Sequence, residues 1–381
     1  MKTRPVRCVL LLLLSSPLLS TGCTPRPLLT SAEGGRRYAI STQGEAASRA
    51  ADEVLREGGN LFDAAIAASF VISVERPHST GIGGGGFWLS YDARTQKLIA
   101  LDFRERAPAK IRLPGALLKK DPQAVTTLLQ DTPLGAGVPG FIAGMSEVHR
   151  RFGRLPWARL VRPAIELAER GFTIYPDLAD ALADRRDVLA KDPDASRIFL
   201  HADGSPYRLG ETLVQKDLGA TLRTIAGAGA DAFYRGEIAK KIDAFSKTNG
   251  GLIRYEDMAD FHADVEEPVS TTFHGYTVYK PGFWSQGPDL IQTLNILDTF
   301  TDKPALNSAD YIHRQVEALK LAYADRDTFY ADPKFSKLNF KSLLSREYAK
   351  DRAKLITARA SMQFQPGSID GKTLPHPTTE N

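Results

Sequence analysis

Residues 61–74 form an apolar segment that constrains the fold more than any other part of the sequence. Apolar side chains occupy every face of the helix that this segment would form, including Ile66 and Phe70. A helix that is apolar all round needs neighbouring elements on every side. A preceding helical pattern begins near Gln43 and ends at Gly58 and Gly59. The sequence therefore predicts a layered core around residues 61–74.

A glycine run at residues 81–86 follows this segment and precedes a strand-forming stretch at residues 87–91. The run fits the spacing of a dinucleotide-binding loop, but such a loop follows a strand and opens a helix. Here the order is helix, glycines, strand. We interpret the glycines as a sharp turn whose backbone closely approaches another part of the chain.

Residues 98–104 are predicted as a second strand, antiparallel to the first and joined to it by a turn at residues 92–97. In this strand Leu101 and Phe103 share one face with Ile99, while Asp102 and Arg104 share the other.

Helical patterns dominate the rest of the chain. One is predicted over residues 156–170, ended by Gly171, and a longer one begins after the N-cap Ser308. The longer helix carries apolar residues at helical spacing, namely Ile312, Val316, Leu319 and Tyr323. Residues 271–279 are predicted as one strand. Helices around a β-hairpin favour an α+β sandwich over a parallel α/β sheet.

The first 23 residues are typical of a signal peptide. Lys2, Arg4 and Arg7 precede an apolar stretch that begins at Val9 and is too short to span a bilayer comfortably. The sequence from Leu19 to Cys23 resembles a bacterial lipoprotein cleavage site, so lipid attachment at Cys23 and ordinary cleavage nearby both stay open. Either outcome predicts an exported protein, free in the periplasm or anchored to the cell envelope by the lipid. Residues 24–37 are predicted as a tether.

Several function classes are excluded or disfavoured by composition. The two cysteines are Cys8 and Cys23, so the chain after the signal has no thiol for disulfides, catalysis or zinc binding. The net charge of +4, without a run of basic residues, does not indicate a nucleic-acid partner. No metal-ligand spacing occurs among the seven histidines, and no cofactor is expected. Residues 283–287 fail as a serine-hydrolase elbow because the first glycine is missing.

Arg104 is the candidate binding residue that the pattern itself suggests. It ends a strand beside charges of both signs and lies close after the glycine run. Two roles stay open from the residues alone, a surface ion pair or a guanidinium that grips a small carboxylate.

Seven stretches together resemble one family, the γ-glutamyltransferases. They are residues 59–65, 77–87, 101–105, 138–140, 155–157, 250–253 and 317–326, and the similarity covers about residues 38–336. The resemblance implies an N-terminal nucleophile hydrolase with an αββα sandwich, made as a precursor that cuts itself into a large and a small subunit. Residues 38–355 are then the large-subunit domain, incomplete without the small subunit. In this family the arginine that matches Arg104 binds the α-carboxylate of the γ-glutamyl group.

The resemblance also implies a nucleophilic threonine at the new N-terminus of the small subunit. It would attack the γ-glutamyl amide of glutathione and pass the acyl group to water or to an amino-acid amine. Thr378 and Thr379 lack the histidine that follows this threonine in the family, so neither is expected to act. We therefore expect Asn381 to precede the scissile bond, after a loosely ordered tail at residues 356–381, and this chain alone to be inactive.

Residues 281–288 depart from the family, because many members have a Pro-Pro-Pro-Ser-Ser-Gly-Gly stretch at this point. The departure leaves two alternatives to a glutathione-cleaving enzyme. One is a related amidase or acylase that acts on a different amide, and the other is a truncated, non-catalytic remnant.

Overall fold

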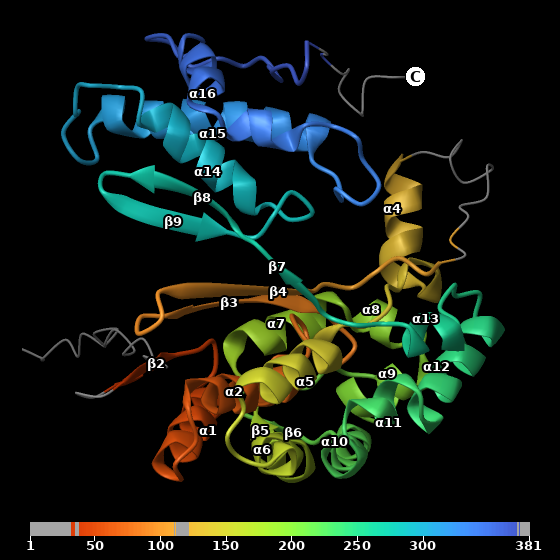
Figure 1. Cartoon of the computed structure of the whole chain (residues 1–381). Coiled ribbons are helices and arrows are strands. Elements are labelled where there is room, and N and C mark those ends of the chain that lie inside the picture. The colour runs from red at the N-terminus through yellow and green to blue at the C-terminus, as the bar shows by residue number, and fades with distance from the viewer. Residues whose placement is uncertain (1–31, 35–37, 110, 112–121, 372, 374–381) are drawn as a thin grey trace, which may run out of the picture.

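The computed structural model describes residues 32–34, 38–109, 111, 122–371 and 373 (Figure 1). The signal peptide, most of the tether, Cys23, Thr378, Thr379 and Asn381 lie outside the described residues. Within the described residues, no helix combines the length and the apolar character needed to cross a bilayer.

The lower part of the molecule is a layer of helices packed under a small sheet (Figure 1). Its central helix is α2 (Leu61–Glu75), which contacts α1 (Glu45–Arg56), α5 (Phe141–Phe152) and α6 (Trp157–Arg170). Nine of the fifteen residues of α2 are buried, and Ile66 and Phe70 are 0% exposed, whereas Leu61 is 65% exposed. The helix is therefore covered over most of its surface, as predicted, but not on every side. Gly171 ends α6 with φ 82°, as the sequence predicted.

The start of α2 is fixed by a capping box. The Asn60 side chain accepts hydrogen bonds from the amides of Phe62 and Asp63, and the Asp63 carboxylate accepts one from the Asn60 amide at 3.0 Å. Asp63 is 0% exposed and also accepts a bond from the Arg154 amide at 2.9 Å. The same carboxylate thus joins the N-terminus of α2 to the chain between α5 and α6.

A three-stranded antiparallel sheet covers these helices, in the order β3–β4–β7. Its strands are β3 (Gly86–Asp92), β4 (Lys97–Phe103) and β7 (Asp264–Glu266). The predicted hairpin is confirmed, with Gly86 opposite Phe103 and Asp92 opposite Lys97. Leu101 and Phe103 face the helices and are buried, as the alternation predicted.

The upper part is a second layer pair, a two-stranded hairpin under three helices (Figure 1). The hairpin is β8 (Val269–Phe273) with β9 (Tyr276–Lys280), and the helices are α14 (Gly287–Leu297), α15 (Ala309–Phe329) and α16 (Arg346–Ala353). Ser308 caps α15 through a bond from the Tyr311 amide, as predicted. Helices, two sheets and helices then follow one another from bottom to top, which is the predicted αββα order.

The single strand predicted over residues 271–279 is wrong. The chain reverses at His274 and Gly275, which have φ 48° and 87°, and the two halves pair as β8 and β9. Two consecutive residues with positive φ make the tight turn that fits the twist of a hairpin. The alternation of polar and apolar residues continues through the turn and therefore hid it.

Smaller elements complete the described chain. The remaining strands are β1 (Ala32–Gly34), β2 (Ala39–Ser41), β5 (Phe172–Thr173) and β6 (Thr212–Leu213). The remaining helices are α4 (Pro122–Asp131), η1 (Pro133–Gly135), α7 (Pro176–Asp184), α8 (Arg186–Leu189), α9 (Pro193–Phe199), α10 (Lys216–Ala228), α11 (Ala230–Tyr234), α12 (Glu237–Thr248), α13 (Tyr255–Ala259) and η2 (Phe340–Leu344).

Candidate active site

Arg104 is the first residue after β4, and its side chain is 58% exposed. Its amide donates a hydrogen bond to the Asp102 carboxylate at 2.9 Å, which fixes the backbone at the strand end. Among the described residues its guanidinium makes one long ion pair, with Nε 3.7 Å from Oε2 of Glu105. The backbone of Arg104 is therefore fixed, while its guanidinium group has no close ionic partner among the described residues.

The glycine run places the start of β3 against the backbone of Arg104. A Cβ atom at Gly85 would lie 2.5 Å from the Phe103 carbonyl oxygen and 2.9 Å from the Arg104 carbonyl carbon. The Gly84 carbonyl oxygen accepts bonds from the amides of Gly140 and Phe141, both at 2.9 Å, at the start of α5. The close backbone approach expected for these glycines is confirmed, and it positions the strand end that carries Arg104.

Arg104 lines a cleft of about 730 Å³ between the two layers. The lower layer contributes Phe87 and Arg104, and the upper layer contributes residues around 280–289, Tyr323, Arg326 and residues 330–332. Arg104, the predicted binding residue, and residues 281–288, which depart from the family pattern, therefore line the same cleft.

Trp284 forms one wall of this cleft. Its indole Nε1 donates a hydrogen bond to Oε2 of Glu266 at 2.7 Å, and its ring meets the Phe87 ring with 6.2 Å between centroids. The neighbouring Ser285 hydroxyl donates to the Gly282 carbonyl at 2.8 Å and accepts from the Gly287 amide, so it stabilises the turn before α14. This wall is thus aromatic, and the bond to Glu266 fixes the orientation of the Trp284 ring.

A second charged pair lines the upper side of the cleft. Arg326 on α15 lies over the ring of Tyr323 at 4.3 Å, and its Nη1 is 3.6 Å from Oδ2 of Asp289 on α14. Burial raises the pKa of Asp289, although the charge of Arg326 opposes this shift. The arginine is held by an aromatic face and by two carboxylates, Asp289 and, at 2.9 Å, Asp327, unlike the open Arg104.

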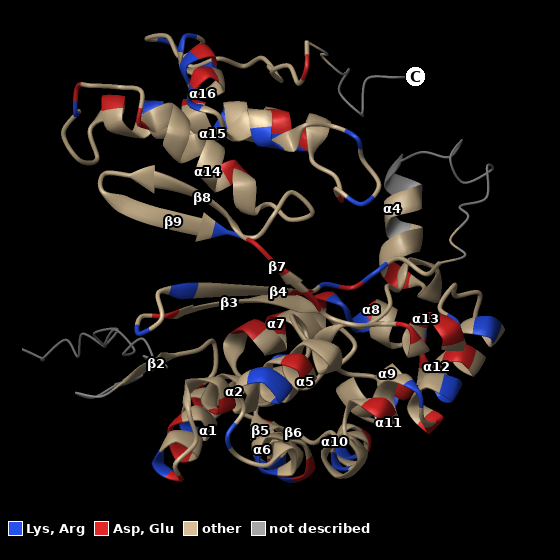
Figure 2. Ribbon diagram, in the orientation of Figure 1, with Lys and Arg blue, Asp and Glu red and all other residues tan. Residues whose placement is uncertain are grey.

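Three carboxylates lie close together on the neighbouring strands β4 and β7. Asp102 lies opposite Asp264, and Glu266 is two residues further along β7, where Figure 2 shows acidic residues between the layers. Burial raises the pKa of Glu266 and of Asp102, and the charge of Asp264 adds to both shifts. Burial acts in the same direction on Asp264, but the bond from Lys334 and the charge of Arg106 outweigh it and lower its pKa.

These charges connect the two layers. The guanidinium of Arg106 lies 2.9 Å from the Asp264 carboxylate, and the Lys334 ammonium lies 2.6 Å from it. Lys334 belongs to the segment after α15, whereas Arg106 follows β4. The ion pairs therefore hold the upper layer to the strand end that carries Arg104.

Sequence reasoning missed most of the cleft. Glu266 and Asp289 gave no signal, because single acidic residues beside a strand and a helix are common on protein surfaces. Trp284 lies in the departing stretch 281–288 and Arg326 in the family-like stretch 317–326, but nothing in the sequence placed either of them opposite Arg104.

Comparison with known proteins identifies the family. A family model described as gamma-glutamyltranspeptidase matches residues 47–380. The glutathione hydrolase proenzyme of Escherichia coli K12 is 36% identical over 323 residues, which cover 83% of this chain and 55% of that protein. The acylase ACY 1 proenzyme of Pseudomonas sp. SE83 is 34% identical over 347 residues, which cover 89% of this chain and 62% of that protein. The chain thus spans less than two thirds of the length of these curated relatives.

Solved structures agree with this assignment. The Helicobacter pylori gamma-glutamyltranspeptidase has a TM-score of 0.82 at 34% identity, over 88% of this chain and 97% of that one. The cephalosporin acylase from Bacillus halodurans has a TM-score of 0.74 at 32% identity, over 84% of this chain and 60% of that one. With the sandwich, the glycine turn and the placement of Arg104, these matches show that the chain belongs to the γ-glutamyltranspeptidase family.

Proposed function

We propose that this chain is the large-subunit part of a γ-glutamyltransferase that cleaves the γ-glutamyl amide of glutathione. A threonine directly after Asn381 would become the N-terminus of the small subunit when the precursor cuts itself. Relatives named as glutathione hydrolase proenzymes support this proposal. The open guanidinium of Arg104 in the cleft is the observation that carries it, because a substrate carboxylate can bind there without displacing a strong ion pair.

In this proposal Arg104 orients the donor and the threonine performs the chemistry. The hydroxyl oxygen of threonine attacks the γ-carbonyl carbon, and the C–N bond then breaks. The free α-amino group, whose ordinary pKa is roughly 7.7–8.0, accepts the hydroxyl proton and passes it to the departing amine. Water or an amino-acid amine next attacks the ester and takes the γ-glutamyl group.

The test is Arg104→Ala in the complete two-subunit enzyme. Loss of a charge-assisted bond at the carboxylate is worth about 1.5–3 kcal/mol, so we expect KM for glutathione to rise roughly 10- to 150-fold. Self-cleavage should survive, because Arg104 is not expected to touch the scissile bond. Arg104→Lys keeps the charge without the fork and should give an intermediate KM. An unchanged KM in Arg104→Ala would exclude the role.

A second candidate, an acylase acting on an amide with a bulky apolar group, is favoured by the aromatic wall. Trp284 and Phe87 offer such a group two aromatic rings, set at 64° to each other, within the same cleft, and relatives include acylase proenzymes. Hydrolysis of glutathione and of an aromatic acyl amide by the complete enzyme separates the two candidates. A kcat/KM that favours the aromatic amide, and that falls in Trp284→Ala, would identify the acylase.

We also propose that the protein is exported through its first 23 residues, with lipid attached to Cys23 as one of two outcomes. The mass of the mature N-terminus checks this, since a lipid on Cys23 adds a mass that ordinary cleavage does not. An uncleaved Met1 would contradict export by this segment.

A further inference from the structure

The cleft beside Arg104 carries more positive charge than a single carboxylate needs. Of the described residues that line it, three are basic and two are acidic, namely Arg104, Lys280, Arg326, Asp289 and Asp332. Their formal charges sum to one positive charge (3 − 2). A cleft lined by an excess of one sign of charge attracts ligands of the opposite sign.

Lys280, the last residue of β9, is a second cation in this cleft without a close carboxylate partner. Arg326, by contrast, pairs with Asp289 and Asp327. Within the part of the chain that the structure describes, the Lys280 ammonium has neither an ion pair nor a side-chain hydrogen bond. An anion can therefore bind to it without displacing another group.

Two observations put the Lys280 side chain at the cleft. A Cβ atom at Gly287, the first residue of α14, would lie 3.0 Å from the Cβ atom of Lys280, so the end of β9 packs against the start of this helix. Burial raises the pKa of Asp289, two residues further along α14, and the charge of Lys280 is among the groups that oppose this rise. Gly287 and Asp289 both line the cleft, so the charge of Lys280 acts there.

Arg104 and Lys280 belong to opposite walls of the cleft. Arg104 follows β4 in the lower layer, whereas Lys280 ends β9 in the upper layer (Figure 1). The cleft between them measures about 730 Å³, within the range of roughly 300–1,000 Å³ that small-molecule sites have. A ligand that fills it can present one anionic group to each wall.

The chemistry of a γ-glutamyl donor decides which part of the donor meets Lys280. The γ-glutamyl group has one carboxylate, the α-carboxylate, because its γ-carboxyl carbon is the carbonyl carbon of the amide. With the α-carboxylate at Arg104, a second carboxylate must belong to the amine that leaves. Glutathione meets this requirement, since its leaving part ends in the carboxylate of glycine.

We propose that Lys280 binds a carboxylate on the leaving amine, so that the enzyme prefers γ-glutamyl amides whose leaving part is anionic. The inference rests on the proposed function, because it takes the α-carboxylate to bind at Arg104. Lys280 is in this role a specificity-determining residue and takes no part in breaking the amide bond.

The experiment compares two chromogenic donors on the complete two-subunit enzyme, γ-glutamyl-4-nitroanilide and γ-glutamyl-3-carboxy-4-nitroanilide. They differ by one carboxylate on the leaving amine and give the same γ-glutamyl-enzyme, so kcat/KM reports only the steps up to departure of the amine. The measured quantity is kcat/KM for the carboxylated donor divided by kcat/KM for the neutral donor. The different intrinsic reactivities of the two anilides cancel when this ratio is compared between variants.

Lys280→Met should lower the ratio roughly three- to tenfold, because one partly exposed bond between charged groups is lost. Lys280→Arg keeps the charge and should retain most of the ratio. Arg104→Ala should lower kcat/KM for both donors by similar factors. Lys97→Met is the matched control, because Lys97 is exposed at the start of β4 and is not among the residues that line the cleft, and its ratio should equal that of wild type.

Salt gives a second measurement that needs no variant. The Debye length falls from about 10 Å at 0.1 M salt to about 3 Å at 1 M, so added salt weakens the attraction between Lys280 and a carboxylate. The ratio in wild type should fall as salt rises, and the ratio in Lys280→Met should change much less. A ratio in wild type that does not depend on salt would overturn the proposal even if Lys280→Met folds poorly.

The inference and the proposed function fail in different ways. If the complete enzyme cleaves neither donor, the proposed function is contradicted and the role of Lys280 falls with it. If the enzyme cleaves both donors but Lys280→Met leaves the ratio unchanged, Lys280 does not recognise the leaving amine. The proposed function then stands without this role.

Discussion

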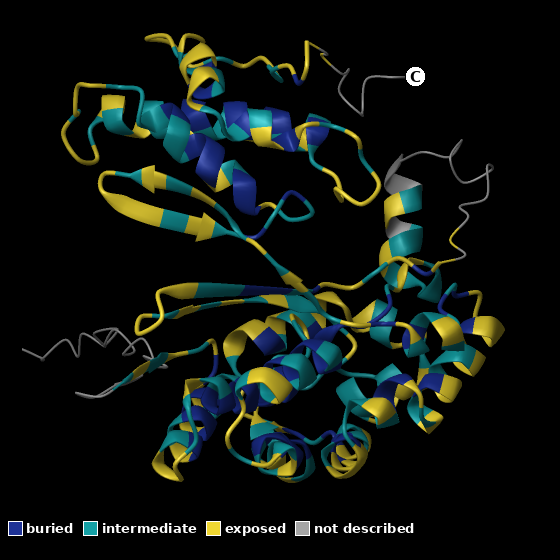
Figure 3. Cartoon of the chain, viewed as in Figure 1, coloured by how far each residue is buried: buried dark blue, intermediate teal, exposed yellow. Residues whose placement is uncertain are grey.

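The lower and upper layers are held together by different physics. In the lower layer a continuous apolar core surrounds α2, whereas the upper layer has two small apolar clusters, around Phe329 and around Leu321. Figure 3 shows buried residues along α14 and α15, with a hairpin of exposed and intermediate residues, β8 and β9, below these helices. The upper layer supplements its small cores with buried Glu317, Asp325 and Arg352. Limited apolar burial is thus combined with charges that have specific partners.

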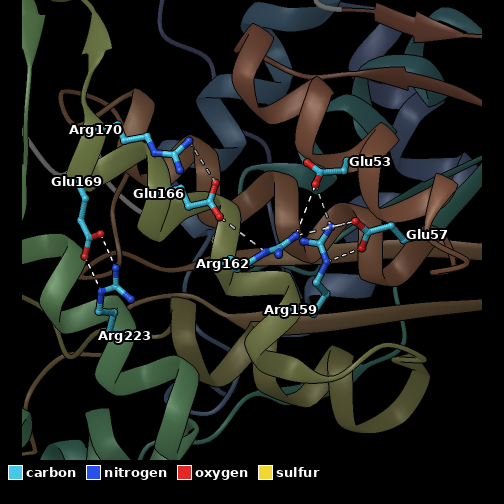
Figure 4. A network of polar contacts seen from close by, with 8 residues as sticks. All are labelled: Glu53, Glu57, Arg159, Arg162, Glu166, Glu169, Arg170 and Arg223. Atoms are coloured by element: carbon cyan, nitrogen blue, oxygen red, sulfur yellow. Dashed lines mark hydrogen bonds and ion pairs between the residues drawn. The ribbon is translucent and has the colours of Figure 1, made fainter.

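Apart from the buried capping residue Asp63, the lower layer carries prominent groups of charges at its surface. Figure 4 shows a row of ion pairs along α1, α6 and α10, in which Arg159 lies 3.1 Å from Glu53 and also pairs with Glu57. At the other end Arg223 pairs with Glu169. Such exposed pairs contribute little to stability, because water screens them.

The largest expected difference between the layers comes from Asp325→Leu. Removing this carboxylate deprives the Tyr348 hydroxyl and the Gln292 amide of their acceptor and leaves Arg352 without its carboxylate partner, so we expect the free energy of unfolding to fall by about 3–5 kcal/mol. Met145→Leu, an apolar exchange at a 2% exposed site of the lower core, should cost less than about 1.5 kcal/mol. Urea denaturation measures the unfolding free energy of both variants, and equal losses would contradict the difference between the layers.

The pH dependence should have opposite sign at two carboxylates, Asp325 in the upper layer and Glu147 in the lower layer. Burial raises the pKa of Asp325, so its contribution favours folding at low pH and is lost as pH rises through the raised value. In α5, hydrogen bonds from Arg150 and Arg151 lower the pKa of Glu147 to about 2, against burial, so its contribution is present above the unfolded pKa and is lost as pH falls towards 2.

Variants that remove each titration test this prediction. Between pH 3 and 7, wild type should gain stability relative to Asp325→Asn as pH falls, and it should lose stability relative to Glu147→Gln. Unfolding free energies measured across this range check both slopes, and slopes of the same sign would contradict the difference between these two carboxylates.

The smallest effect is expected at the surface row. Arg162 is 50% exposed and pairs with Glu53 and Glu166 at 3.6 and 3.8 Å. Arg162→Ala should change the unfolding free energy by no more than about 1 kcal/mol, and added salt should shrink the difference. A loss comparable to that of Asp325→Leu would show that the surface row is a main support of the lower layer.

Local sequence determined the lower layer and the base of the site. Apolar residues on every face of residues 61–74 required a covered helix, and the glycines after it required a close backbone approach. The alternation before Arg104 set which side of β4 is buried. These features depend on neighbours in the chain, so periodicity and residue type were enough to predict them.

Tertiary structure decided the upper layer and the cleft. Ile312, Val316 and Tyr323 share a face of α15 as predicted, yet they are 51%, 45% and 43% exposed, while Glu317 and Asp325 on the same helix are buried. Periodicity tells which residues share a face, but the segments that pack on a helix decide which face is covered. Trp284, Arg326 and Arg104 line one cleft although they are far apart in the chain. Only the packing of the two layers brings them together.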